Sequence, residues 1–182
     1  MIIVNPYILN QGTLLSYVSN GDSNGLFYYI GTSALTVAWI NPSTSGQITA
    51  SSSGNFNASY EPPRATDRTD DYPWHSNGAA SWIKFDLELY RIRVDDYTLR
   101  TRTDYQYGTY LTDWILEGSN DDSDWTAIDT RNGQTYTHST TTRYTTTPTV
   151  GYRYLRIRDT SANSHMVIGE VEFYGSLTLN SE

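Results

Sequence analysis

Cysteine is absent from this chain of 182 residues. No disulfide can form, so the fold is held by packing and hydrogen bonds alone. A cysteine nucleophile is excluded as well, and no His-Glu-x-x-His segment occurs. Residues 21–25 match the Gly-x-Ser-x-Gly pattern, but they lie in a turn-rich segment rather than between a predicted strand and a predicted helix. The three histidines, His75, His138 and His165, stand far apart in the sequence. We therefore expect no enzyme, although a catalytic site assembled from distant strands leaves no local motif.

Positive charge is also scarce. Lys and Arg number 12 against 20 Asp and Glu, which gives a net charge of −8. Proteins that bind nucleic acids use Lys and Arg to neutralise phosphates, so we expect no nucleic-acid partner. The same acidic balance disfavours anionic membrane surfaces as binding partners.

Long apolar runs are missing too. No stretch approaches a membrane-spanning length, and the first six residues, Met-Ile-Ile-Val-Asn-Pro, lack the basic and apolar parts of a signal peptide. We expect a soluble protein without membrane insertion. It is then cytoplasmic, or it reaches a virion or a cell surface by a route other than ordinary secretion.

Alternating apolar residues dominate the part of the chain that remains. Leu155 and Ile157 fall on one face of a predicted strand, and Val171 and Phe173 do so in the next strand. Alternation at period two is what a half-buried antiparallel strand requires. Further strands are predicted at residues 26–31, 35–40, 48–53, 82–87 and 91–95. No window combines a helical period with caps, so the predicted class is all-β.

Two local irregularities are expected. The apolar parity changes after residue 95, which predicts a β-bulge near Asp95 and Asp96. Between the strands that follow Trp114 and Trp125, residues 118–124 form a polar turn that contains three aspartates. This turn lacks the glycine and the terminal glutamate of a calcium-binding EF-hand loop, so we interpret it as structural.

Three segments in this order resemble the discoidin domain, the coagulation-factor C-type module of the galactose-binding-like superfamily. They read Trp-Ile-Leu-Glu-Gly-Ser-Asn-Asp from Trp114, Tyr-Arg-Tyr-Leu-Arg-Ile from Tyr152, and Ile-Gly-Glu-Val-Glu-Phe-Tyr-Gly from Ile168. The resemblance implies a single jelly-roll-like antiparallel β-sandwich over residues 26–175. Residues 1–25 are then an N-terminal arm or a first strand, and residues 176–182 a C-terminal tail.

The resemblance also implies a non-catalytic binding module that recognises carbohydrate through loops at one end of the sandwich. A sugar packs its C–H face on an aromatic ring and needs directed hydrogen bonds for its hydroxyls. The long loop at residues 54–80 is a natural place for such a site. The candidate ligand-binding residues are Tyr60, Arg64, Trp74, His75, Tyr105, Tyr107, His138 and Arg143. Trp74 has an alternative interpretation as a buried anchor of its loop.

A structural Ca²⁺ is a further implication of the resemblance. The matching positions are Asp67, Asp70 and Glu170, whose carboxylates supply the hard oxygen ligands that Ca²⁺ prefers. Arg68, however, stands where the family has a glycine. The alternative is a solvated loop with local Arg–Asp pairing.

A second function remains open from the sequence. A lone domain of this kind suits a virion structural protein, such as a capsid decoration or tail-associated protein. Such a protein contacts other proteins and forms a homo-oligomer or part of a larger assembly. Aromatic residues gathered at the loop end would favour a glycan ligand. An apolar patch on a sheet face or in residues 1–25 would favour assembly.

Overall fold

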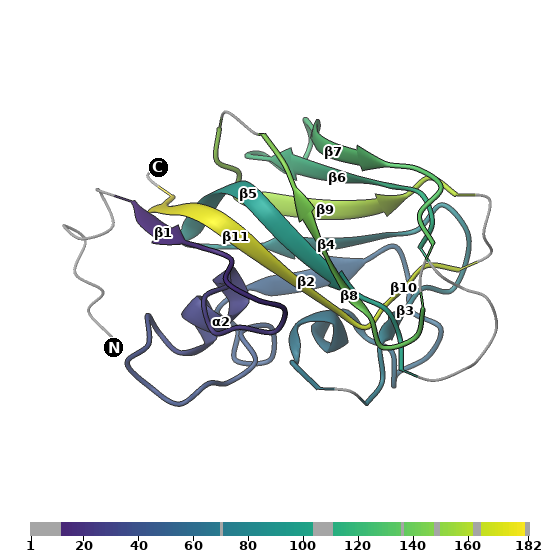
Figure 1. Cartoon of the computed structure of the whole chain (residues 1–182), viewed down its shortest axis with the longest axis horizontal. Helices are drawn as coiled ribbons and strands as arrows, with labels where there is room; N and C mark the ends of the chain where they lie inside the picture. The colour runs from purple at the N-terminus through teal and green to yellow at the C-terminus, as the bar shows by residue number, and fades with distance from the viewer. Residues whose placement is uncertain are drawn as a thin grey trace.

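The computed structural model describes residues 12–69, 71–103, 111–135, 137–147, 150–161 and 165–180. Two antiparallel sheets lie against each other in these parts of the chain (Figure 1). One sheet has the order β1-β11-β5-β8, from Thr13–Leu15, Glu170–Leu179, Tyr90–Arg100 and Thr141–Thr145. The other has the order β2-β4-β9-β6-β7, from Thr49–Ser52, Trp82–Asp86, Tyr154–Asp159, Trp114–Ser119 and Thr126–Arg131. The predicted antiparallel β-sandwich is confirmed.

The core lies between the two sheets and follows the predicted alternation. Phe85 of β4 and Leu155 of β9 are fully buried, as is Phe173 of β11 on the opposite sheet. Arg156 and Arg158 point out of the second sheet and pair with Glu117 of β6. Strands with one apolar and one polar face can bury a core in only one register, because a shift by one residue would exchange the two faces.

The predicted bulge is present in the long pair of β5 and β11. Tyr174 pairs with Asp96 and Gly175 pairs with Val94, so Asp95 has no residue opposite. Gly175 has a φ of 148°, and a Cβ atom there would lie 1.9 Å from the carbonyl oxygen of Arg93. Only glycine fits this position. The extra residue Asp95 shifts the alternation by one, which explains why the apolar parity of β5 changes at this point.

A chain of hydrogen bonds joins the two sheets through the core. The indole of Trp114 donates to the hydroxyl of Tyr97 at 2.9 Å, and that hydroxyl donates to Asp129 at 2.7 Å. Tyr97 lies on β5, whereas its two partners lie on β6 and β7. Burial raises the pKa of Tyr97 well above its usual value, so the hydroxyl stays a donor at any ordinary pH.

The acidic turn between β6 and β7 satisfies its own backbone. The carboxylate of Asp121 accepts from the N–H groups of Ser123 and Asp124 at 2.9 and 2.8 Å, and from the hydroxyl of Ser119 at 3.0 Å. These hydrogen bonds lower the pKa of Asp121 to about 2. Asp122 pairs with Lys84 of β4. Both carboxylates therefore have structural partners, in agreement with the predicted turn.

The strands predicted at residues 26–31 and 35–40 are wrong. Leu26–Gly31 form the α-helix α2, and the strand expected at residues 35–40 is absent, because residues 32–36 form turns and residues 38–40 have no regular structure. Leu26, Phe27 and Ile30 are buried against the core, a spacing that a single helical turn brings to one side. Six residues are too few for a helical period to stand out.

No helix in the described residues is long and apolar enough to cross a membrane.

The first turn of α2 is capped by a residue far away in the sequence. Glu172 of β11 accepts from the backbone N–H groups of Phe27 at 2.8 Å and Tyr28 at 3.3 Å. The N-cap residue is Gly25, and a Cβ atom there would lie 2.1 Å from Cγ of Glu172. The carboxylate thus takes the capping role that a local Ser or Asp side chain usually has. Burial is the largest influence on Glu172 and raises its pKa to about 7.

Strand β11 continues to Leu179, beyond the expected end of the sandwich at residue 175. Its last residues pair with β1, where Thr13 lies opposite Leu177 and Leu15 opposite Gly175. Residues 13–15 thus form a first strand, one of the two alternatives expected for residues 1–25, and part of the expected C-terminal tail pairs with it.

The pKa of Glu172 predicts a pH dependence of stability. A carboxyl group with a pKa of about 4.5 in the unfolded chain and about 7 in the folded chain binds more protons when folded between these values. Its contribution to the free energy of unfolding is complete below pH 4.5 and is lost as the pH rises through 7. We expect the stability of the wild type relative to Glu172→Gln to fall across this interval. Urea titrations at several pH values measure it, and parallel profiles of the two proteins would contradict the assignment.

Candidate functional site

The loop end of the sandwich carries the candidate site. Here the 3₁₀-helix η1 (Pro62–Thr66) leads through residues 67–73 into the short strand β3 (Trp74–His75). Strand β3 pairs with β10 (Val167–Ile168), with His75 opposite Val167 and Trp74 opposite Ile168. The end of β5 and the starts of β8 and β11 lie at the same end of the molecule (Figure 1). Segments that lie far apart in the sequence, such as β3 and β10, are thus brought together.

Aromatic rings gather at this end in what we call the aromatic cluster, which consists of Phe56, Tyr60, Tyr72, His75 and His165. Phe56 stacks on His75 with ring centroids 4.9 Å apart and planes 9° apart. The edges of Tyr60 and His165 meet the His75 ring at 5.4 and 5.1 Å. Tyr72 extends the cluster outward through a T-shaped contact with Tyr60 at 5.5 Å. Such edge and offset contacts are the favoured arrangements of aromatic pairs.

The backbone fixes the inner part of the aromatic cluster. The N–H of Phe56 donates to the carbonyl of His75 at 2.9 Å. The N–H of Ser76 donates to the carbonyl of Met166 at 2.9 Å, and the hydroxyl of Ser76 accepts from the N–H of Met166 at 2.8 Å. His165 Nδ1 lies 3.1 Å from the carbonyl oxygen of Ser76. The rings are therefore held by hydrogen-bonded backbone rather than by side-chain packing alone.

Two rings of the aromatic cluster face solvent. Phe56 is 55% exposed and Tyr72 is 53% exposed, whereas His75 is buried beneath them. The guanidinium carbon of Arg64 lies 5.9 Å from the centre of the Tyr72 ring. An exposed ring beside a charged donor offers both kinds of contact that a sugar needs.

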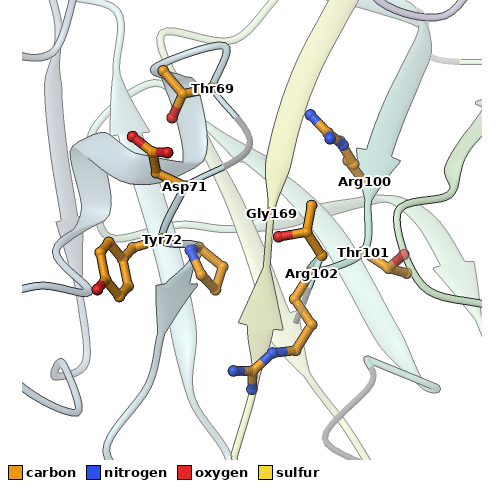
Figure 2. A pocket seen from close by; sticks show the side chains of 9 residues that line it. Thr69, Asp71, Tyr72, Arg100, Thr101, Arg102 and Gly169 are labelled. Atoms are coloured by element: carbon orange, nitrogen blue, oxygen red, sulfur yellow. The ribbon is translucent and has the colours of Figure 1, made fainter. Parts of the chain in front are cut away.

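A shallow hollow adjoins Tyr72. It has a volume of about 10 Å³, enough for about one water molecule, and is open on one side. Figure 2 shows Tyr72 at the left, on the segment that leads into β3. Gly169 lies in the middle of the view, with Arg100 above it and Arg102 below it. A Cβ atom on Gly169 would lie 2.8 Å from the carbonyl oxygen of Thr101, so glycine is required for this close approach. The hollow is lined by Thr69, Asp71, Tyr72, Pro73, Arg100, Thr101, Arg102, Thr103 and Gly169.

The ligand-binding candidates from the loop at residues 54–80 lie in different surroundings. Tyr60 and His75 belong to the aromatic cluster, and Arg64 lies beside Tyr72 and pairs with Asp67. Trp74 is fully buried, and its indole donates to Asn55 at 3.1 Å. Its ring is therefore closed to a ligand, and Trp74 anchors the loop from within the core.

The candidates from the other loops are only partly brought to this end. The segment that carries His138 is held beside the hollow, because the hydroxyl of Thr101 donates to the carbonyl of Thr137 and the N–H of Ser139 donates to that of Arg102. Arg143 points from β8 onto the outer sheet face, where it pairs with Asp96 and covers Tyr17 at 4.2 Å. This placement separates Arg143 from the aromatic cluster. Tyr105, Tyr107 and Asp70 lie outside the described residues.

Three members of the site escaped the sequence analysis. Phe56 and Tyr72 sit in the long loop that was singled out, but neither was named as a ligand-binding residue. His165 joins them only through the pairing of β3 with β10. Aromatic residues in polar loop sequence were an available signal for Phe56 and Tyr72, whereas nothing local marks His165.

Two carboxylates of the implied Ca²⁺ site, Asp67 and Glu170, lie in the described residues, and each lies beside an arginine. One oxygen of Asp67 accepts from the N–H and the hydroxyl of Thr69, and the other lies 3.4 Å from Arg64. Glu170 lies 4.0 Å from the guanidinium of Arg100. Across the described residues, no three acidic, histidine or cysteine side chains lie together in a way that could hold a metal ion.

A sequence model described as "F5/8 type C domain" matches residues 47–173. A carbohydrate-binding module of a family 31 glycoside hydrolase from Clostridium perfringens superposes with a TM-score of 0.64 at 18% identity, over 87% of this chain and 99% of that one. A second Clostridium perfringens module, solved in complex with GalNAc-β-1,3-galactose, has a TM-score of 0.61 at 14% identity, over 71% and 96%.

A similar protein of much greater length is E3 ubiquitin-protein ligase Ufd4 of Drosophila melanogaster. It is 29% identical over 177 residues, which cover 90% of this chain. The chain spans 6% and 15% of the lengths of two curated relatives that it matches. The likeness therefore concerns one part of each relative and not the whole protein.

Trp74 is buried and Tyr72 is exposed, so replacing each by alanine should change the stability of the fold to a different extent. We expect Trp74→Ala to lower the free energy of unfolding by about 3–5 kcal/mol, because it removes a fully buried indole from the core. Tyr72→Ala should cost about 1 kcal/mol or less, since half of that side chain faces solvent. Urea unfolding of both variants measures the difference. Equal losses of stability would show that Trp74 is not the anchor we describe.

Proposed function

Because the chain belongs to the F5/8 type C domain family, we propose that it is a non-catalytic module that binds carbohydrate, in particular a cell-surface glycan, at the loop end of the sandwich. The observation that carries this proposal is the pair of exposed rings, Phe56 and Tyr72, set beside polar side chains. Folding alone does not require two aromatic rings to be half in water, whereas a sugar face packs well on such rings.

The hollow beside Tyr72 supplies groups for hydrogen bonds. The exposed Asp71 offers acceptor oxygens, and the hydroxyl of Thr69, which donates to Asp67, can still accept a hydrogen bond. A shallow, open site of this kind suits the end or the side of a glycan chain better than a deeply enclosed small molecule. The solved complex of a structurally similar module with GalNAc-β-1,3-galactose supports the ligand class.

The proposal assigns recognition, rather than cleavage, to this surface. The similar structures named above, which are carbohydrate-binding modules, support this assignment.

A glycan array tests the proposal. The purified protein is displayed multivalently, because single weak sites need avidity to be detected. We expect reproducible binding to a defined set of glycans and a loss of about tenfold or more for Tyr72→Ala or Phe56→Ala, since each removes a stacking surface.

Val150→Ala is the matched control. Val150 is 49% exposed, similar to the two rings, and lies close to Tyr152, which pairs with Ile92 near the start of β5. The hollow lies at the other end of β5. Binding that survives Tyr72→Ala and Phe56→Ala unchanged, or folded protein that binds no glycan, would refute the assignment.

Assembly with other copies is the second candidate, and one observation favours it. Leu14, Val18 and Leu35 are exposed and line one hollow, and Leu89 lines the next, with Tyr29 shared between the two. Exposed apolar side chains in such proximity are typical of protein contacts. The comparisons give no support to a virion protein, so this candidate is limited to self-association through that surface.

Sedimentation velocity tests the second candidate. If the apolar surface joins two copies, the wild type sediments as a dimer whose population rises with concentration, and Leu14→Ser shifts it to monomer. Tyr72→Ala should leave the dimer intact, because Tyr72 lies outside these hollows. A monomer at all concentrations would contradict self-association and leave carbohydrate recognition untouched.

A further inference from the structure

Arg68 lies where the loop that lines the hollow meets the N-terminal segment. Its φ of 58° is in the left-handed region, which is unusual for a residue with a side chain. The side chain is 20% exposed and points toward residues 21–28 and β11 rather than into solvent. Such a backbone conformation in a partly buried arginine indicates that its contacts compensate for the strain.

The guanidinium of Arg68 is surrounded by groups that favour a cation. It donates to the carbonyl oxygens of Gly21 at 2.8 Å and Asp22 at 2.9 Å. It lies 3.6 Å from the carboxylate of Glu172 and 4.9 Å from the centre of the Tyr28 ring. Carbonyl and carboxylate oxygens are also the ligands that bind Ca²⁺ in proteins. A fixed positive charge already satisfies these oxygens.

The neighbouring acidic residues are likewise matched with arginines. Asp67 lies beside Arg64, and Glu170 lies beside Arg100. Asp67, Glu170 and Glu172 thus each have a guanidinium partner. A divalent cation bound to one of these carboxylates would be repelled by the neighbouring arginine.

We propose that Arg68 serves as a built-in cation that replaces a bound Ca²⁺, so that this module holds its N-terminal segment and its ligand-binding loop together without metal. The clamp joins main-chain oxygens of residues 21–22, the first turn of α2 and strand β11 to the start of the loop that carries Tyr72. Its consequence for the hollow rests on the proposed function, but the clamp itself does not.

The wild-type protein gives the first test without any variant. Thermal unfolding is followed by calorimetry near pH 7.5 in excess EDTA and in excess CaCl₂. A resident ion that binds only the folded state raises the midpoint temperature, whereas a metal-free clamp is indifferent. We expect the two midpoints to agree within error. A clear upward shift with CaCl₂ would overturn the proposal, whatever the outcome of the glycan array.

Hydrogen exchange of the full chain tests the clamp itself. The amides of Phe27 and Tyr28 donate to Glu172, which Arg68 holds in place. In Arg68→Ala we expect their protection to fall by about tenfold or more, without an effect of CaCl₂. Arg68→Lys keeps the charge but loses the forked donors, and we expect an intermediate loss. Unchanged protection in Arg68→Ala would refute the clamp.

Arg156→Ala is the matched control. Arg156 also pairs with a carboxylate, Glu117, and also covers a ring, Trp125 at 3.9 Å, but it lies on the other sheet. Its loss should leave the amides of Phe27 and Tyr28 as protected as in the wild type. An equal loss of protection in both arginine variants would mean general destabilisation and would count against the clamp.

Discussion

The capping of α2 by Glu172 is the interaction on which the N-terminal part of the fold depends. A helix of six residues gains little stability from its own hydrogen bonds, because nucleation costs more than so short a helix returns. The carboxylate of Glu172 satisfies two otherwise unpaired N–H groups at its first turn. With α2 fixed, Phe27 packs on Phe85 and Phe173, with ring centroids 5.1 and 5.7 Å away. One buried carboxylate thus holds the helix α2 against the core.

The same strand that carries Glu172 also reaches the candidate site. Gly169, which lines the hollow, immediately precedes β11, and its N–H donates to the carbonyl of Arg100 at 2.8 Å. The pairing of β5 with β11 therefore positions both Glu172 and Gly169. It also brings Gly169 close to Thr101 at the candidate site. The loop end rests on a rigid base, which is what a preorganised binding surface requires.

The strands and the bulge could be predicted from the sequence, because period-two alternation and its change of parity depend on neighbouring residues. The helix α2 could not, since its cap lies 145 residues away and its six residues show no period. Burial of Trp74 was equally hidden, because a tryptophan in a polar loop sequence fits an anchor and a ligand platform alike. His165 comes to the aromatic cluster only through strand pairing across 89 residues.

Exposed rings are the part of this molecule that folding does not explain. Trp74, in the same loop, shows that an aromatic side chain can be buried completely beside the aromatic cluster. Phe56 and Tyr72 instead leave more than half of their surface in water, although burying an aromatic side chain stabilises a fold by about 1.5–3 kcal/mol. Phe56 is held by stacking on His75 and Tyr72 by a T-shaped contact with Tyr60, so both exposed rings have defined positions. A rigid apolar surface kept in water at the end of an acidic sandwich is suited to a ligand that combines apolar faces with hydroxyl groups, which is the chemistry of a sugar.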